Sequence, residues 1–175
     1  GLNSIPKITF DSIKLDSNFK KIRAGQLLQN EDVAKLQSHV LLELCKMYHA
    51  KGWVQQFHLG ALRDTNSKAL NTLGPATGFD SIGDFNQANE LSAFLNELDS
   101  KNQLTKTILF NLNPRDNDVF ASMTGNFNNG TQVGKMQYGS GWWFLDQKIG
   151  MENQINSLSN MGLLSHFVGM LTDSR

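Results

Sequence analysis

Reactive side chains follow directly after an apolar run near the end of the chain. Residues 167–171 are apolar, and Asp173 and Arg175 come within the next four positions. In proteins that alternate strands and helices, ligands bind at the carboxyl ends of the strands. A carboxylate can move protons or bind a metal ion, and a guanidinium binds anionic groups. The sequence therefore predicts a ligand-binding strand end at residues 171–175.

Three other apolar stretches also lead into residues that could bind a ligand. They lie near residues 53–58, 107–111 and 135–138, and they bring, in order, His58 and Arg63, Arg115 and Asp116, and Trp142 and Trp143. Parallel strands would place all these side chains at one rim, where His58 and Asp173 could bind a divalent ion. The arginines could pair with a carboxylate or phosphate of a substrate. Simpler readings remain open: a structural His58, an Arg115–Asp116 ion pair, and tryptophans in the core.

Helical patterns separate the four expected strands. They cover residues 31–50, 86–100, 119–123 and 146–161, whereas residues 1–30 have no clear periodicity. Short apolar strands that alternate with helices and end in polar loops indicate a parallel sheet covered by helices. Four such units correspond to half of an eight-stranded barrel or to a small doubly wound sheet.

Composition narrows the class of protein. The chain has 175 residues, with sixteen basic and sixteen acidic side chains, so no net field favours nucleic acid or an anionic membrane. No apolar run approaches the roughly 18 to 20 residues that span a bilayer. Cys45 is the single cysteine and is expected to be a small core residue in a reducing compartment. The sequence has no phosphate-binding loop, dinucleotide fingerprint or cysteine-based zinc motif.

Several segments carry a family resemblance. Residues 53–63 read WVQQFHLGALR, and residues 73–82, 107–117, 139–144 and 168–175 follow in the same order as in the uronate isomerase (glucuronate isomerase) family, which they resemble. That family belongs to the amidohydrolase superfamily of distorted (β/α)8 TIM-type barrels. The resemblance implies that residues 31–175 form the second half of such a barrel. It implies that residues 1–30 belong to an N-terminal helical insertion.

The resemblance also implies roles for particular residues. His58 and Asp173 would bind a divalent metal ion, zinc being the first choice, and Asp173 with Arg175 would be catalytic. Arg63, Arg115 and Trp142 would bind a hexuronic acid substrate. The reaction would interconvert D-glucuronate with D-fructuronate, and D-galacturonate with D-tagaturonate, by proton transfer from C2 to C1. The enzyme would be a cytoplasmic homo-oligomer without nucleic-acid or membrane partners.

Two features of the family's metal site and barrel are missing from the sequence. The chain has no His-x-His pair for the first strand, and nothing follows Arg175 to form the last helix. We therefore expect the 175-residue chain alone to be inactive. Two alternatives remain: a metal-dependent hydrolase of the same superfamily that acts on a sugar acid or lactone, and a non-enzymatic assembly fragment.

Overall fold

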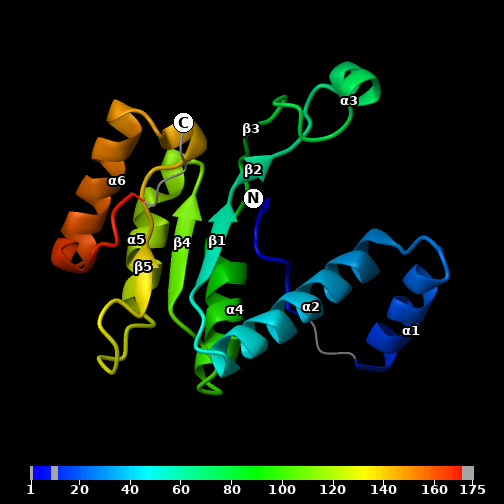
Figure 1. The fold of residues 1–175 in the computed structure, drawn as a ribbon, viewed down its shortest axis with the longest axis horizontal. Coiled ribbons are helices and arrows are strands. Elements are labelled where there is room, and N and C mark those ends of the chain that lie inside the picture. Colours follow the sequence, from blue (N-terminus) through cyan, green and yellow to red (C-terminus); the bar gives the residue numbers. More distant parts are fainter. Residues whose placement is uncertain (1, 9–11, 171–175) are drawn as a thin grey trace.

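Three parallel strands form the central sheet of the chain (Figure 1). The computed structural model describes residues 2–8 and 12–170, and the side chains of residues 12 and 13 are not part of that description. The strands lie in the order β1 (Gln55–Leu59), β4 (Thr107–Asn111) and β5 (Met136–Tyr138). These are three of the four strands expected from the sequence, and the α/β class with parallel βα units is confirmed.

The two faces of the sheet differ because side chains alternate along a strand. In β1, Gln55, Phe57 and Leu59 are buried, whereas Gln56 is exposed and His58 is only partly covered. The central strand β4 is buried along its whole length. Phe57 meets Phe94 of a covering helix edge to face, with ring centroids 5.6 Å apart. The sheet therefore has one face packed against helices and one more open face that carries His58.

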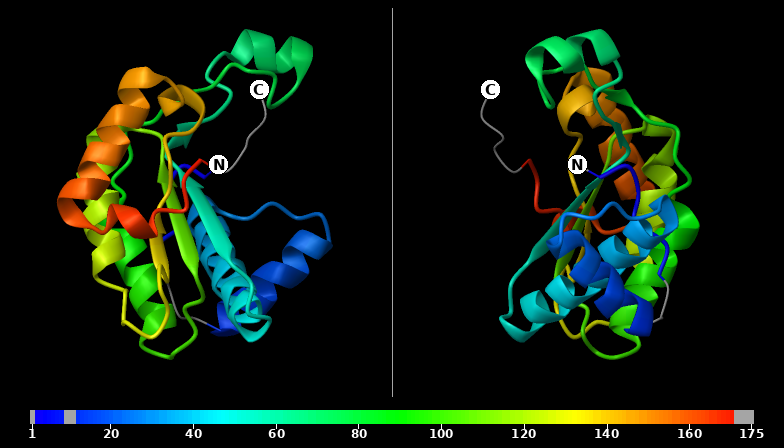
Figure 2. Two further views of the ribbon diagram at one scale, coloured as in Figure 1. Left: turned by 60° about the vertical axis from the view of Figure 1, so that its left-hand side comes forward. Right: turned by 90° about the vertical axis from the view of Figure 1, so that its right-hand side faces the viewer.

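The helices that follow β1, β4 and β5 in the chain cover the packed face. They are α4 (Ala88–Asp99), α5 (Asn117–Gly125) and α6 (Lys148–Met161), and Figure 2 shows them on one side of the strands. In α4, Leu91, Phe94, Leu95 and Leu98 recur at three- and four-residue steps and are fully buried. The core thus lies between the sheet and these helices, where apolar side chains from both layers meet.

Two more helices and an arm complete the fold, and the second of these helices contributes Leu42 and Cys45 to the core. Helix α1 (Ser12–Arg23) packs against α2 (Asn30–Ala50), so the region without clear periodicity is helical in part. The arm projects beyond the carboxyl end of β1 and holds two short antiparallel strands, β2 (Ala61–Leu62) and β3 (Ser81–Ile82), joined through α3 (Ser67–Leu73) (Figure 1). This antiparallel pair was not expected from the sequence.

The strand expected at residues 167–171 is not present in its described part, residues 167–170. Instead, the side chain of Gln137 in β5 takes the place of a backbone ladder. Its amide nitrogen donates to the carbonyl of His166 at 2.7 Å, and its amide oxygen accepts from the backbone N–H of Val168 at 3.1 Å. Gly169 then adopts a φ of 81°, which is incompatible with a strand.

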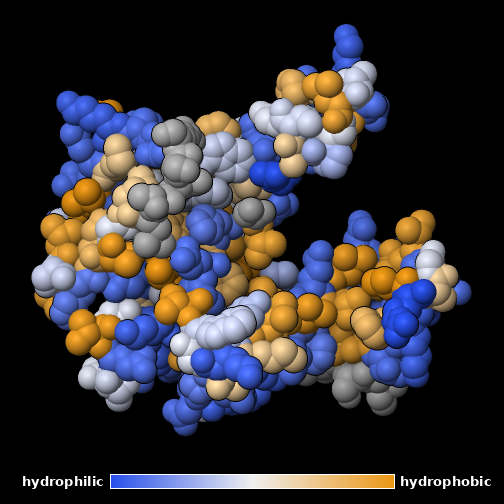
Figure 3. Space-filling model, in the orientation of Figure 1, coloured by the Kyte–Doolittle hydropathy of each residue, from blue (hydrophilic) through white to orange (hydrophobic). Residues whose placement is uncertain are grey.

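Apolar side chains remain exposed over α2. Figure 3 shows them along the α1–α2 region, and they include Val40, Leu44 and Met47. None of the helices within the described residues is long and apolar enough to span a membrane.

Candidate active site at the carboxyl ends of the strands

His58 lies near the carboxyl end of β1 on the open face of the sheet. The imidazole stacks on the ring of Phe110, with centroids 4.3 Å apart and planes at 3°. The register of β1 and β4 pairs these two residues directly, so the stacking follows from the strand alignment. The structure therefore brings His58 to the predicted rim and fixes the plane of its ring.

Trp142 reaches the same imidazole from the loop after β5. Its ring meets that of His58 edge to face, with centroids 4.6 Å apart. Its indole N–H donates to the backbone carbonyl of Asn111 at 2.9 Å, which fixes the ring at the end of β4. The predicted substrate-binding tryptophan and the predicted metal-binding histidine are thus in direct contact.

A buried polar network lies behind Asn111. The Tyr138 hydroxyl is 2.8 Å from Oδ1 of Asn111 and 2.9 Å from Oδ1 of Asn117. The Asn111 amide nitrogen donates to Oδ1 of Asn117 and to the carbonyl of Asn113, each at 2.7 Å. Burial raises the pKa of the Tyr138 hydroxyl, so it remains a protonated donor. This network holds the ends of β4 and β5 together beneath the rim.

Arg63 is held by the arm. Its guanidinium lies 3.0 Å from the carboxylate of Asp80, whose side chain is almost completely buried. The guanidinium also lies over the ring of Trp143, 5.5 Å from the centroid. Asp80 accepts a further hydrogen bond from the backbone N–H of Asp64 at 2.8 Å. Arg63 therefore ties the arm to the loop that carries the tryptophans.

Arg115 occupies the loop after β4 and pairs with two carboxylates. It binds the exposed Asp84 and lies 3.3 Å from the buried Asp116, so the ion pair considered for Arg115 and Asp116 is present. Burial raises the pKa of Asp116 despite the opposing effect of Arg115. Burial would lower the pKa of Arg115, but its bonds and charge interactions with Asp116 and Asp84 outweigh this and raise it.

The predicted metal site is represented by one side chain in the described part of the protein. Asp173 and Arg175 lie outside the described residues. Among the described residues, no group of three His, Cys, Asp or Glu side chains is placed to hold a metal ion. His58 alone does not form such a site, so residues 2–8 and 12–170 do not by themselves fit a bound metal ion.

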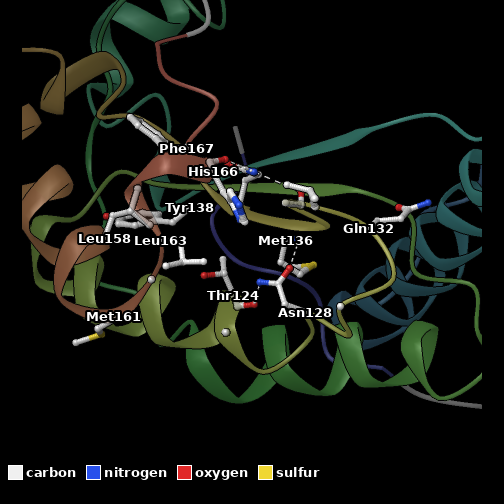
Figure 4. Close-up of a pocket in the computed structure, with 16 residues that line it drawn as sticks. Thr124, Asn128, Gln132, Met136, Tyr138, Leu158, Met161, Leu163, His166 and Phe167 are labelled. Atoms are coloured by element: carbon white, nitrogen blue, oxygen red, sulfur yellow. Dashed lines mark hydrogen bonds between the residues drawn. The ribbon is translucent and has the colours of Figure 1, made fainter.

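A separate pocket of about 390 Å³ lies between β5, α5, α6 and residues 162–167 (Figure 4). Its titratable lining residues are Tyr138 and His166, and the Tyr138 hydroxyl is already bonded within the buried network. Figure 4 shows the side chains of Leu158, Leu163 and Phe167 bordering the same space. This pocket lacks the charged groups expected at a site for a sugar acid.

Phe110, Gly139 and Tyr138 were not anticipated as site residues. Phe110 was assigned only to an apolar strand, and Gly139 only to the segment 139–144 that resembles the family. The sequence did hold one clue, since residues that pair across adjacent strands point to the same face of the sheet. Using it would have required the register, which apolar runs alone do not define.

Comparisons with known proteins give the same assignment along the whole chain. The family model for glucuronate isomerase matches residues 1–175. The chain is 59% identical to a uronate isomerase of Flavobacterium johnsoniae and 54% identical to one of Cellvibrio japonicus, each over all of its 175 residues. It spans 38% and 37% of the lengths of those proteins.

Solved structures agree with the sequence relatives. The crystal structure of a uronate isomerase from Thermotoga maritima matches 99% of the chain with a TM-score of 0.86 and 31% identity, and the match spans 37% of that protein. A glucuronate isomerase from Caulobacter crescentus has a similar fold, with a TM-score of 0.83 at 23% identity over 100% of this chain and 35% of that one. On the match of the family model to every residue, the chain belongs to the glucuronate isomerase family.

Proposed function

We propose that this chain is part of a uronate isomerase that interconverts D-glucuronate with D-fructuronate, and D-galacturonate with D-tagaturonate. The observation that carries the proposal is the family match over residues 1–175. The position of His58 and Trp142, in contact at the carboxyl ends of parallel strands, supports it, because ligands bind at that end of such sheets.

The proposed reaction is an aldose–ketose isomerisation of the open-chain sugar. A base removes the proton from C2 while the C1 carbonyl oxygen gains one, which gives a cis-enediol. The proton then returns to C1, and loss of the O2 proton leaves a ketone at C2. We assign the proton transfer to Asp173, with Arg175 as a second catalytic residue, because a carboxylate of suitable pKa can carry out both steps.

Of the two candidates Arg63 and Arg115, Arg115 is the better one for binding the substrate carboxylate. Its partner Asp84 is 78% exposed, and a solvent-exposed ion pair contributes only about 0–1 kcal/mol, so a substrate carboxylate can replace it at little cost. Arg63 is paired with Asp80, whose side chain is only 4% exposed; if Arg63 moved, this buried carboxylate would lose its ion pair and keep, among the described residues, only the bond from the Asp64 N–H. We therefore propose that Arg115 binds substrate and that Arg63 orients the arm, with Trp142 packing against the sugar.

A divalent metal ion, zinc in the first place, would act as a Lewis acid on the substrate oxygens. We propose His58 and Asp173 as two of its ligands, with the remaining donors supplied by the rest of the full-length protein. The 175-residue chain alone is therefore proposed to be inactive. The unpaired Cys45 supports a cytoplasmic enzyme, and the exposed apolar side chains of α2 support a homo-oligomer.

The test compares the full-length protein with the 175-residue chain, each supplied with zinc. We expect the full-length protein to convert D-glucuronate and D-galacturonate to the corresponding ketoses, as followed by NMR, and the chain to convert neither. Hydrolysis of a sugar lactone without isomerisation would replace this proposal with the hydrolase alternative. Turnover by the 175-residue chain at the full-length rate would refute the incomplete-site argument. Gel filtration of the full-length protein tests the oligomer, and a monomer would contradict it.

A further inference from the structure

Three residues lie side by side at the carboxyl ends of the three strands: one in β1, one in β4 and one directly after β5. His58 in β1 is the register partner of Phe110 in β4. Leu109 pairs with Tyr138, and the N–H of Gly139 donates to the carbonyl of Leu109 at 2.8 Å, which places Gly139 beside Phe110 on the far side from His58. Phe110 therefore lies between an imidazole and a residue without a side chain.

Gly139 leaves room that the ring of Phe110 fills. A Cβ atom at Gly139 would lie 2.3 Å from Cε1 and 2.5 Å from Cδ1 of Phe110, well inside van der Waals contact. Gly139 is absent from the residues with positive φ, so an alanine would not strain its backbone. The three atoms nearest such a Cβ all belong to the ring of Phe110, so this ring is the first obstacle to a side chain at position 139.

The ring of Phe110 has little freedom to move away. Phe110 is 3% exposed, and its ring stacks on the imidazole with centroids 4.3 Å apart. Trp142 closes a second side of the imidazole at 4.6 Å and is itself bonded to the carbonyl of Asn111. A shift of the Phe110 ring would therefore be transmitted to His58.

We infer that Phe110 and Gly139 are positioning residues for His58, with Phe110 setting the plane of the imidazole and Gly139 making room for Phe110. The inference rests on the proposed function, in which His58 is a residue of the active site. Neither residue needs to touch the substrate. Their effect comes from holding a site residue in one orientation, and in enzymes a misplacement of about 1 Å can cost about 100-fold in rate.

The first test measures steady-state kinetics of the full-length isomerase. We expect Phe110→Leu and Gly139→Ala each to lower kcat by about 10- to 100-fold with little change in KM, and Phe110→Tyr to retain most of the activity. In the Phe110→Leu background, Gly139→Ala should cost less than in the wild type, because Cε1 and Cζ of Phe110, two of the three atoms nearest the added Cβ, are gone. Phe94→Leu is the matched control, since it removes a buried ring from the opposite face of the sheet.

The second test observes His58 directly in the full-length protein with isotope-labelled histidine rings. In the Gly139→Ala variant the His58 resonances should move although Phe110 is still present, whereas Phe94→Leu should leave them in place. Unmoved His58 resonances in Gly139→Ala, or kcat values of Phe110→Leu and Gly139→Ala equal to that of Phe94→Leu, overturn the inference. A wild-type protein without isomerase activity refutes the proposed function, and the His58 resonances then decide the positioning on their own.

Discussion

The buried network around Tyr138 gives a stability prediction that can be worked from individual atoms. The Tyr138 hydroxyl is the hydrogen-bond donor to Oδ1 of Asn111 at 2.8 Å. Asn117 Oδ1, the second neighbour of the hydroxyl, also accepts from the Asn111 amide nitrogen at 2.7 Å. In the variant Tyr138→Phe, Asn117 thus keeps a donor, whereas Oδ1 of Asn111 is left buried without one.

The expected cost follows from that single orphaned oxygen. Leaving a buried acceptor unsatisfied costs about 1–3 kcal/mol. The ring of Tyr138 is retained in phenylalanine, so apolar burial changes little. We therefore expect Tyr138→Phe to lower the free energy of unfolding by about 1–3 kcal/mol.

The measurement is urea unfolding at constant pH, followed by the fluorescence of the three tryptophans. The midpoint should fall while the slope stays unchanged, because the area exposed on unfolding is the same. Tyr48→Phe is the matched control, since the hydroxyl of Tyr48 makes no hydrogen bond to the other described residues and its loss should fall within about 0.5 kcal/mol. Equal midpoints for the two variants would refute the role assigned to the network.

Three further predictions concern separate parts of the chain. Burial raises the pKa of the Cys45 thiol to about 12, so a thiol-specific reagent at pH 8 should label it only after unfolding, and rapid labelling of the folded protein would contradict its place in the core. Burial raises the pKa of Asp116 above its ordinary 3.8, so the folded state binds this proton more readily than the unfolded state does. The free energy of unfolding should therefore fall as pH rises from 3.8 through the raised value. Asp116→Asn removes this titration, and a difference in unfolding free energy between the two proteins that stays constant with pH would disprove the prediction. Gly60 has a φ of 104°, so Gly60→Ala should lower the free energy of unfolding, measured in urea, by about 1–3 kcal/mol. Gly125→Ala is the control: Gly125 lies in a helix without positive φ, and apart from its chain neighbours and helix backbone no atom of the described residues lies within 4 Å of an added Cβ, so this change should be neutral or stabilising.

The sequence predicted best the elements whose pattern is set locally. The stripe of Leu91, Phe94, Leu95 and Leu98 required one face of a helix to be buried, and α4 buries all four. The apolar run at residues 107–111 required burial on both faces, and β4 is the central strand of the sheet. Local periodicity was sufficient in both cases because each segment had one way to remove its apolar side chains from water.

The arm shows where local pattern carries no information. Strands β2 and β3 have two residues each, and their pairing depends on contacts between residues far apart in the chain. One of these is the pair of Arg63 with Asp80, and another is the bond from the Asp64 N–H to the same carboxylate. The arm has no sequence periodicity, because its conformation depends on the buried carboxylate of Asp80, which needs hydrogen-bond donors from residues 63 and 64.

Residues 167–170 show how a side chain can change an element that the apolar pattern predicts. These residues have the composition of a buried strand next to β5, yet Gln137 in β5 bonds the backbone of His166 and Val168 through its side-chain amide. A side-chain amide has a carbonyl oxygen that accepts and an NH₂ group that donates, like a peptide group, so it can replace the backbone hydrogen bonds of one residue pair in a sheet. The chain is then held beside the sheet without being part of it, and Gly169 turns it at φ 81°. Substituting Gln137 by an apolar residue of similar size would remove these two bonds. The position of residues 166–168 therefore depends on a polar side chain of β5 as well as on the packing of Phe167 against the core, and an apolar pattern predicts only the second.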